Sequence, residues 1–386
     1  MNIKVFTKIL KDKSFTDYQK MKYNYGENFN AFLQTLEDLY YKPLPLFDFD
    51  GNHIVFIENH AAVNQSAVKL LLQSQDQHYG IKAAEDEIVA TSAIESIDFS
   101  RDSVRRILKG MAPKDEQENR ILGIKHGLEF IADTDNKITE ENLYKLYMMT
   151  VGDFLSDDDK LLEGKLYRHD TMCVVSDHVE HSGLDYKKVP EFMKSLIAFA
   201  NAEDDINDLT KATIIHFYIA FVHPYFDGNG RIARLVHLWF LIQKGYQSAL
   251  FIPFSSKIEN SRKAYYGAYT AIEENKKISG KIDVTPFILY FINNVYNKMN
   301  EGSTAVETLT IYDDAVKYGK ITEKETKLWK FVLSYYGTTE FSTKQLEKDF
   351  GDAAYATIRG FVLKFEELGL LSSVRYGPRV KYKVVK

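Results

Sequence analysis

The fold is decided by one stretch of sequence, His223-Pro224-Tyr225-Phe226-Asp227-Gly228-Asn229-Gly230-Arg231-Ile232-Ala233-Arg234. The segments on either side, residues 212–222 and 232–243, are apolar at helical spacing and are predicted to be helices. Because proline disfavours helical backbone in the residue before it, the first helix should end at or near His223. The sequence therefore predicts a helix–loop–helix joint at the centre of a mainly α protein.

The loop of this joint has the residues of an anion site. Gly228 and Gly230 permit backbone conformations that are closed to other residues, so neighbouring amides can point at one place near a helix N-terminus. Arg231 and Arg234 are expected in the first turn of the second helix, where each cation costs a few tenths to about 1 kcal/mol against the helix dipole. Positive charge in such a place indicates a strongly negative ligand, and arginine suits phosphate oxygens.

Two further side chains complete the chemistry of the loop. Asp227 offers the hard oxygen that Mg²⁺ takes together with phosphate oxygens, and His223 can accept a proton near neutral pH. Each residue alone has a plainer interpretation: a capping histidine, a simple glycine turn or a solvated pair of arginines. The joint pattern favours a single phosphate site instead.

The stretch resembles the signature of the Fic family, H-[PA]-F-x-[DE]-G-N-G-R-x-x-R, with Tyr225 in place of the family phenylalanine. The added hydroxyl is expected to need a partner or a path to solvent. The resemblance implies transfer of AMP from Mg-ATP to a tyrosine, threonine or serine hydroxyl of a protein. It assigns roles to the residues of the loop: His223 as base, Asp227 as Mg²⁺ ligand, Gly228, Asn229 and Gly230 as phosphate cradle with Asn229 at the α-phosphate, and Arg231 and Arg234 at the β- and γ-phosphates.

Two segments outside the signature resemble other Fic elements. Residues 164–168, GKLYR, resemble the family pattern G-x-Y-R with one extra residue, and residues 171–188 then resemble a hairpin flap. The flap would accept a protein substrate as an added strand, although an ordinary surface hairpin fits the same residues. Downstream, Tyr266 would help to wall the adenine site, and the alternative is a tyrosine on a half-buried helix.

A regulatory segment is expected at residues 91–96, TSAIES, which resemble the inhibitory motif [ST]-x-x-x-E-[GN] with Ser96 in the last place. The resemblance implies that Glu95 pairs with Arg234 and keeps the γ-phosphate out of its productive position. Residues 255–260 fit the same short pattern, but they lie where the family has its segment after the signature. The chain thus resembles the class whose inhibitory helix lies N-terminal to the core.

The remaining sequence suggests the domain organisation. Residues 1–110 are expected to be mostly helical, with helices at 14–41, 63–72 and 88–108 and a hairpin around Asp50-Gly51. Residues 111–300 form the expected Fic core, and 301–320 a connector. Residues 321–386 carry 12 Lys and Arg against 8 Asp and Glu. They predict a winged helix that contacts DNA or protein.

Composition and charge indicate the general class of protein and the partners it can have. The 386 residues have a formal net charge of −5, which gives no general attraction to nucleic acid or membrane. Cys173 is the single cysteine, and the lysine-rich start lacks a signal-peptide pattern, so a cytoplasmic protein without membrane contact is expected. Several alternatives stay open: the reverse de-AMPylase, a nucleotide-responsive DNA-binding regulator, a UMP or phosphocholine transferase, self-modification, and a homodimer.

Overall fold

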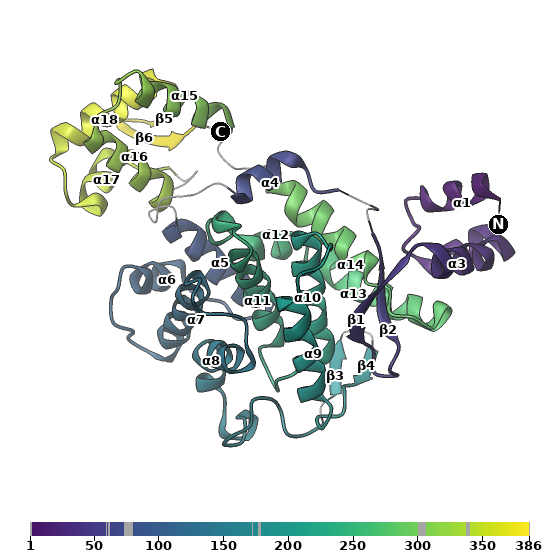
Figure 1. The fold of residues 1–386 in the computed structure, drawn as a ribbon. Helices are drawn as coiled ribbons and strands as arrows, with labels where there is room; N and C mark the ends of the chain where they lie inside the picture. Colours follow the sequence, from purple (N-terminus) through teal and green to yellow (C-terminus); the bar gives the residue numbers. More distant parts are fainter. Residues whose placement is uncertain are drawn as a thin grey trace.

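The structure is a computed structural model that describes residues 2–58, 60, 62–72, 80–171, 173–176, 179–299, 306–336 and 340–385. The chain is mainly helical, and each strand among these residues belongs to a two-stranded antiparallel hairpin. The N-terminal helices and the C-terminal unit lie on opposite sides of a central group of helices (Figure 1). Within the described residues, every helix is too short or too polar to cross a lipid bilayer.

The N-terminal part consists of α1 (Ile3–Leu10), α2 (Tyr18–Tyr25), α3 (Glu27–Leu39), β1 (Tyr41–Phe47) and β2 (His53–Ile57). Its helices pack around their own cluster of buried side chains, which includes Phe29, Phe32 and Leu36, whereas the hairpin contributes Leu46 and Phe56 to the main core. The hairpin that was predicted around Asp50-Gly51 is confirmed, and β2 also pairs with residues 282–284, through the Val55 amide and the Ile282 carbonyl at 2.9 Å.

The prediction of one helix over residues 14–41 was wrong. The chain breaks at Gly26 into α2 and α3, and Pro43 and Pro45 lie inside β1, which follows α3. A register shift between Pro43 and Phe47 accommodates the second proline, which has no amide to donate to the partner strand.

The central group contains the helices that carry the signature. Its elements are α4 (Gln65–Leu72), α5 (Gly80–Ile94), α6 (Arg101–Leu108), α7 (Glu116–Ala132), α8 (Glu140–Thr150), η2 (Gly152–Phe154), η3 (Asp157–Asp159), β3 (Cys173–Ser176), β4 (Val179–Ser182), α9 (Val189–Asn201), α10 (Asp208–Val222), α11 (Asn229–Gln243), η4 (Gln247–Phe251), α12 (Phe254–Asn260), α13 (Arg262–Ser279), α14 (Thr285–Tyr290), η5 (Phe291–Val295) and η6 (Tyr296–Lys298). The expected helix over residues 88–108 is in fact two helices, α5 and α6, and Glu95 and Ser96 lie in the turn between them.

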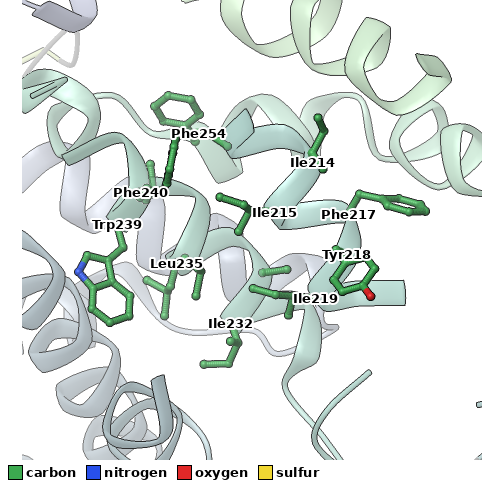
Figure 2. Close-up of a cluster of buried hydrophobic side chains, with 14 of the residues drawn as sticks. Ile214, Ile215, Phe217, Tyr218, Ile219, Ile232, Leu235, Trp239, Phe240 and Phe254 are labelled. Carbon is green, nitrogen blue, oxygen red and sulfur yellow. The ribbon is translucent and has the colours of Figure 1, made fainter. Parts of the chain in front are cut away.

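Helices α10 and α11 form the centre of the main core. Both are apolar on nearly all sides, which is typical of helices surrounded by protein. Figure 2 shows Ile215, Ile219 and Leu235 among the side chains that fill the space around them. At the start of α10, the Asn207 side chain accepts the amide of Leu209 at 3.0 Å and so caps the helix. The joint between the two helices is therefore held by rigid elements on both sides.

The C-terminal unit consists of α15 (Val306–Lys317), α16 (Glu323–Tyr335), α17 (Thr343–Phe350), α18 (Tyr355–Glu367), β5 (Leu371–Tyr376) and β6 (Arg379–Val384). It packs around a separate cluster of buried side chains that includes Trp329, Phe361 and Phe365. The last three helices and the hairpin appear in the predicted order. Residues 300–305 and 337–339, at the start of the connector and after α16, lie outside the described residues, and α15 makes part of the expected connector helical. The domain boundaries and the contact with DNA or protein stay predictions.

Candidate functional site

His223 lies at the joint between α10 and α11, in the left-handed region of backbone conformation with φ 54° and ψ 63°. This conformation costs a residue other than glycine about 1–2 kcal/mol, so neighbouring contacts must hold it. Arg168 supplies them. Its Nε donates to the His223 carbonyl at 2.9 Å, its backbone amide donates to the Pro224 carbonyl at 2.9 Å, and its Nη2 donates to the carbonyl of Leu184.

The loop after His223 is held by Asn229. The Asn229 side chain accepts the Tyr225 amide at 2.9 Å and donates to the Tyr225 carbonyl at 2.8 Å. Both ends of its carboxamide are thus bonded to the backbone of one loop residue. The structure gives this side chain a role in loop shape, and the amides at the start of α11 remain as donors toward a ligand.

The two glycines of the loop serve different purposes. Gly228 has φ 77°, and a Cβ there would lie 2.6 Å from Val151, so both its conformation and its surroundings require glycine. Gly230 lies inside α11 and has no unusual backbone conformation, which corrects the expectation that it would. Its lack of a side chain leaves room for Glu95, because a Cβ there would lie 2.5 Å from Glu95 Oε1.

Tyr225 is fully buried beneath the loop, and its ring stacks on that of Tyr147 with centroids 3.7 Å apart. The expectation that its hydroxyl would have a hydrogen-bond partner or a path to solvent was wrong. Among the described residues, neither this hydroxyl nor that of Tyr147 has a hydrogen-bond partner. The nearby Tyr167 differs, because its hydroxyl donates to Glu140 at 3.0 Å.

Arg231 and Asp227 lie together at the mouth of the loop. Arg231 Nη1 donates to the Thr150 carbonyl at 3.4 Å, and Nη2 lies 3.7 Å from the exposed carboxylate of Asp227. Burial lowers the pKa of the Arg231 guanidinium, and its Nε has no partner among the described residues. A buried guanidinium with spare donors is suited to an added anion.

Arg234 is buried in the second turn of α11, one turn later than the sequence suggested. Its Nη2 lies 2.6 Å from Glu95 Oε1, and its Nε donates to Thr91 Oγ1 at 2.9 Å. Burial alone would raise the pKa of the Glu95 carboxyl, but the charge of Arg234 lowers it below its ordinary value. The structure therefore places the expected pair, Glu95 and Arg234, in direct contact.

The turn at Ser96 explains how a serine can end α5. Ser96 has φ 60°, the left-handed conformation usually taken by glycine or asparagine. The Ser96 amide donates to the Ala93 carbonyl at 2.9 Å, and the Ile97 amide donates to the Ser92 carbonyl at 2.9 Å. This is the Schellman arrangement of a helix C-terminus, with serine in the glycine position. It presents Glu95 toward α11.

The side chains of His223 and Tyr266 are also near this pair, since the charge of Glu95 acts on both. Burial lowers the pKa of the His223 imidazole, which favours its neutral form at pH 7. Tyr266 is 45% exposed, and burial followed by the charge of Glu95 raises its pKa. The guanidinium carbon of Arg262 lies 5.9 Å from the centre of the Tyr266 ring. Tyr266 thus lies at the edge of the site with an accessible ring.

The predicted flap is present as a hairpin. Strands β3 and β4 pair in antiparallel register, with Cys173 opposite Ser182 and Ser176 opposite Val179. Met172 and residues 177–178 of the expected flap lie outside the described residues. The hairpin is joined to the site by Arg168, since this residue bonds both the His223 carbonyl and the carbonyls of Asp170 and Leu184 on either side of the hairpin.

A magnesium ion would find the exposed carboxylate of Asp227 at the mouth of the loop. Within the described residues, no group of three or more His, Cys, Asp or Glu side chains could share a metal ion. Asp227 has an exposed carboxylate whose Oδ1 accepts the Gly228 amide at 2.6 Å, which leaves other lone pairs free. One carboxylate with several phosphate oxygens is the usual protein site for Mg²⁺, so this residue fits the ion together with a nucleotide.

Sequence reasoning gave no role to several residues that shape the site. Arg168 was only part of the GKLYR resemblance, Thr91 was the first letter of the inhibitory motif, and Tyr147 carried no signal. The missing information is spatial, because the bonds of Arg168 and Thr91 go to backbone or side chains that are far apart in sequence.

Comparison with known proteins finds similarity over part of the chain. Residues 137–241 match the Fic/DOC family. A probable protein adenylyltransferase of Aquifex aeolicus is 26% identical over 144 residues, which cover 36% of this chain and 44% of the relative. A protein adenylyltransferase Fic of Nematostella vectensis is 26% identical over 134 residues, which cover 34% of this chain and 30% of the relative. The chain spans less than half the length of these curated relatives.

Solved structures show the same fold. A Fic family protein from Desulfovibrio desulfuricans superposes with a TM-score of 0.51 at 16% identity, covering 84% of this chain and 97% of that one. A Fic domain containing signaling protein from Bacteroides thetaiotaomicron gives a TM-score of 0.51 at 19% identity, covering 61% and 93%. The family match over residues 137–241, the relatives and the shared fold show that this chain is similar to Fic proteins.

Proposed function

We propose that this protein is a protein adenylyltransferase that transfers AMP from Mg-ATP to a hydroxyl side chain and is inhibited by its own Glu95. The observation that carries the proposal is the place of the Glu95 carboxylate. It lies against Gly230 in the first turn of α11 and 2.6 Å from Arg234. A carboxylate there occupies the kind of anion site that a phosphate would take.

The residues of the site suit the reaction. The neutral imidazole of His223 takes the proton of the target hydroxyl, whose oxygen attacks the α-phosphorus of ATP. The bond from this phosphorus to the oxygen bridging the β-phosphate breaks, and pyrophosphate leaves. Arg231, Arg234 and the amides at the start of α11 stabilise the negative charge of the phosphates. The bonds of Asn229 to Tyr225 keep the loop in the required shape.

Asp227 would hold the magnesium ion. The ion supplies charge neutralisation on the phosphates when it is bound. The Gly228 amide donates to the Asp227 carboxylate and orients it. The guanidinium of Arg231, 3.7 Å away, partly balances the negative charge of this carboxylate.

The neighbouring elements offer places for the two substrates. Tyr266, with its exposed ring, would pack against the adenine. The β3–β4 hairpin would pair with an extended segment of the target protein, because a two-stranded hairpin has free backbone donors and acceptors at both edges. A target held there would lie near His223, because Arg168 bonds the carbonyl of His223 and the carbonyls of Asp170 and Leu184 at the two ends of the hairpin.

The test is labelling with ATP that carries ³²P at the α-phosphate, in the presence of Mg²⁺ and a cell lysate. Wild type, Glu95→Gly and the double variant Glu95→Gly with His223→Ala are compared. We expect weak labelling by wild type, strong labelling by Glu95→Gly and none by the double variant. If Glu95→Gly binds ATP but labels nothing, the transferase proposal fails. Loss of AMP removal from a labelled target in the same variant would favour de-AMPylation instead.

A further inference from the structure

Helix α5, which ends just before Glu95, is held from outside by the segment that contains α12 and α13. Near the middle of α5, the buried carboxylate of Glu87 accepts the Ser255 amide at 2.8 Å and the Ser255 hydroxyl. Ser255 lies at the start of α12, where the helix dipole favours a carboxylate. This contact fixes the body of α5 but lies more than two turns before Glu95.

A second contact from the same segment reaches the end of α5. Arg262 is the first residue of α13, and its Nη1 donates to the Ala93 carbonyl at 3.4 Å. That carbonyl also accepts the Ser96 amide in the turn that presents Glu95. A guanidinium at this place donates to a carbonyl that would otherwise lack a donor at the helix C-terminus, and its positive charge interacts favourably with the helix dipole.

Arg262 also acts on the charge of Glu95. The charges that hold the pKa of the Glu95 carboxyl below its usual range are those of Arg234, Arg231 and Arg262. Arg262 comes from an element that is separate from the phosphate loop, and its own guanidinium lies over the exposed ring of Tyr266. It is therefore the one of these three arginines that touches both the end of α5 and the aromatic wall.

We propose that Arg262 is a positioning residue for Glu95: it tethers the last turn of α5 and thereby sets how often Arg234 is free to bind a phosphate. This inference rests on the proposed function, because it describes the regulation of the same site. Without the tether, the last turn of α5 opens more often and Glu95 leaves Arg234. Arg262 acts in this way through Glu95 and not on the nucleotide.

A double-mutant comparison tests this role. Arg262→Ala and Arg262→Lys are made in wild type and in Glu95→Gly, with Lys263→Ala, the exposed next residue, as matched control. Self- or lysate labelling with α-³²P-ATP is measured with the thermal unfolding of each variant. In wild type, Arg262→Ala should raise labelling about 3- to 10-fold, because a long charge-assisted bond and a nearby charge are lost. Arg262→Lys and Lys263→Ala should stay within about 2-fold of wild type, because Arg262→Lys keeps a cation near the carbonyl.

The Glu95→Gly background gives the decisive outcome. There, Arg262→Ala should change labelling by less than about 2-fold, since the group it positions is absent. If Arg262→Ala lowers labelling in both backgrounds, Arg262 contacts the nucleotide and the inference is overturned. It is also overturned if folded Arg262→Ala labels no more than wild type. If Glu95→Gly alone fails to label, the proposed function fails, and this result is separate from any effect of Arg262.

Discussion

The carboxylate of Glu95 lies 2.6 Å from the guanidinium of Arg234, although 139 residues separate them in sequence. Thr91, one turn before Glu95 on α5, accepts two further bonds from the same guanidinium, at its hydroxyl and its carbonyl. Thr91 and Glu95 thus engage Nε and Nη2 of Arg234. Under the proposed function, an incoming phosphate would compete with the carboxylate for this guanidinium, and that competition would control the site.

The first prediction concerns the charge of Glu95. Glu95→Gln keeps the size of the side chain but removes its charge, so a nucleotide phosphate competes with a neutral amide for Arg234. We expect the affinity for a non-hydrolysable ATP analogue with Mg²⁺ to rise about tenfold, measured by titration calorimetry. Glu129→Gln, which changes an exposed glutamate on α7, serves as the control and should have wild-type affinity. Equal affinities for Glu95→Gln and wild type would contradict competition at Arg234.

The second prediction concerns Asn229. Asn229→Ala leaves the buried amide and carbonyl of Tyr225 without their side-chain partners, so the free energy of unfolding should fall by about 2–4 kcal/mol. Urea denaturation measures this loss. Asn142→Ala, which removes one bond to the Lys137 carbonyl near the surface, should cost less than about 1 kcal/mol. A fully stable Asn229→Ala that binds ATP weakly would instead place the Asn229 side chain on the nucleotide.

The third prediction concerns Arg168. A lysine has one terminal ammonium and cannot span the carbonyls of His223, Asp170 and Leu184 that the guanidinium joins. In the Glu95→Gly background, Arg168→Lys should therefore lower the rate of labelling about tenfold or more, because His223 loses its position. The affinity for ATP should stay within about 2-fold, because Arg168 does not contact the phosphate loop amides.

The exposed Arg379 on β6 offers the matched control. Arg379→Lys makes the same chemical change far from the site and should leave labelling unaltered. If Arg168→Lys weakens ATP binding as much as it slows labelling, then Arg168 shapes the nucleotide site and not only the position of His223.

Much of the site could be predicted from sequence because its residues are contiguous. The signature places a histidine, an acid, two glycines and two arginines on one loop and the first two turns of the following helix, and a single local geometry brings them together. Glu95 was predicted only through the family resemblance, since nothing in its local sequence indicates a partner 139 residues away. The fold prediction had the same limit. Local signals placed the Asp50-Gly51 hairpin and the C-terminal helices, but the breaks at Gly26 and after Ile94 were missed, because single residues with positive φ, Gly26 and Ser96, end the helices inside long apolar patterns.

The role of single residues was harder to predict than their presence. Gly230 looked like a residue needed for backbone freedom, but the structure shows that it makes room for Glu95. Asn229 was expected at the α-phosphate, and this stays a prediction; in this structure its carboxamide is bonded to the Tyr225 backbone. For Gly230 the sequence pattern indicated the residue type, and only the packing around it showed which property of that type is used.

The fourth prediction concerns Tyr225. Its buried hydroxyl has no partner among the described residues, so Tyr225→Phe removes a desolvated polar group without opening a large cavity. The free energy of unfolding should rise by about 1 kcal/mol, and labelling in the Glu95→Gly background should not change. Tyr167→Phe is the matched change, and it should lower stability by about 1 kcal/mol because the bond to Glu140 is lost. A loss of stability in Tyr225→Phe would show that the hydroxyl is bonded after all.

The last prediction concerns the pH dependence of transfer. Burial lowers the pKa of His223 below its ordinary 6.5, and the charge of Glu95 acts in the opposite direction. A base must be unprotonated, so the labelling rate of Glu95→Gly should stay level from pH 8 to pH 6.5 and fall only below that value. Removing Glu95 takes away a negative charge that favours the imidazolium, so the pKa of His223 falls further. The pH below which the rate declines should therefore also be lower. Rates measured with saturating Mg-ATP check this, and an acid limb above pH 6.5 would contradict His223 as a buried base.

The stability of the folded protein sets the lowest pH at which these rates can be measured. Burial lowers the pKa of His237 to about 3, so the folded protein keeps this imidazole neutral while the unfolded chain takes up a proton below pH 6.5. The free energy of unfolding should therefore fall as pH drops through this range, by up to about 1.4 kcal/mol per pH unit from His237. Circular dichroism at each pH separates this loss from protonation of His223. A rate that falls while the signal of the folded protein is unchanged reports the catalytic base, and a rate that falls together with that signal reports unfolding.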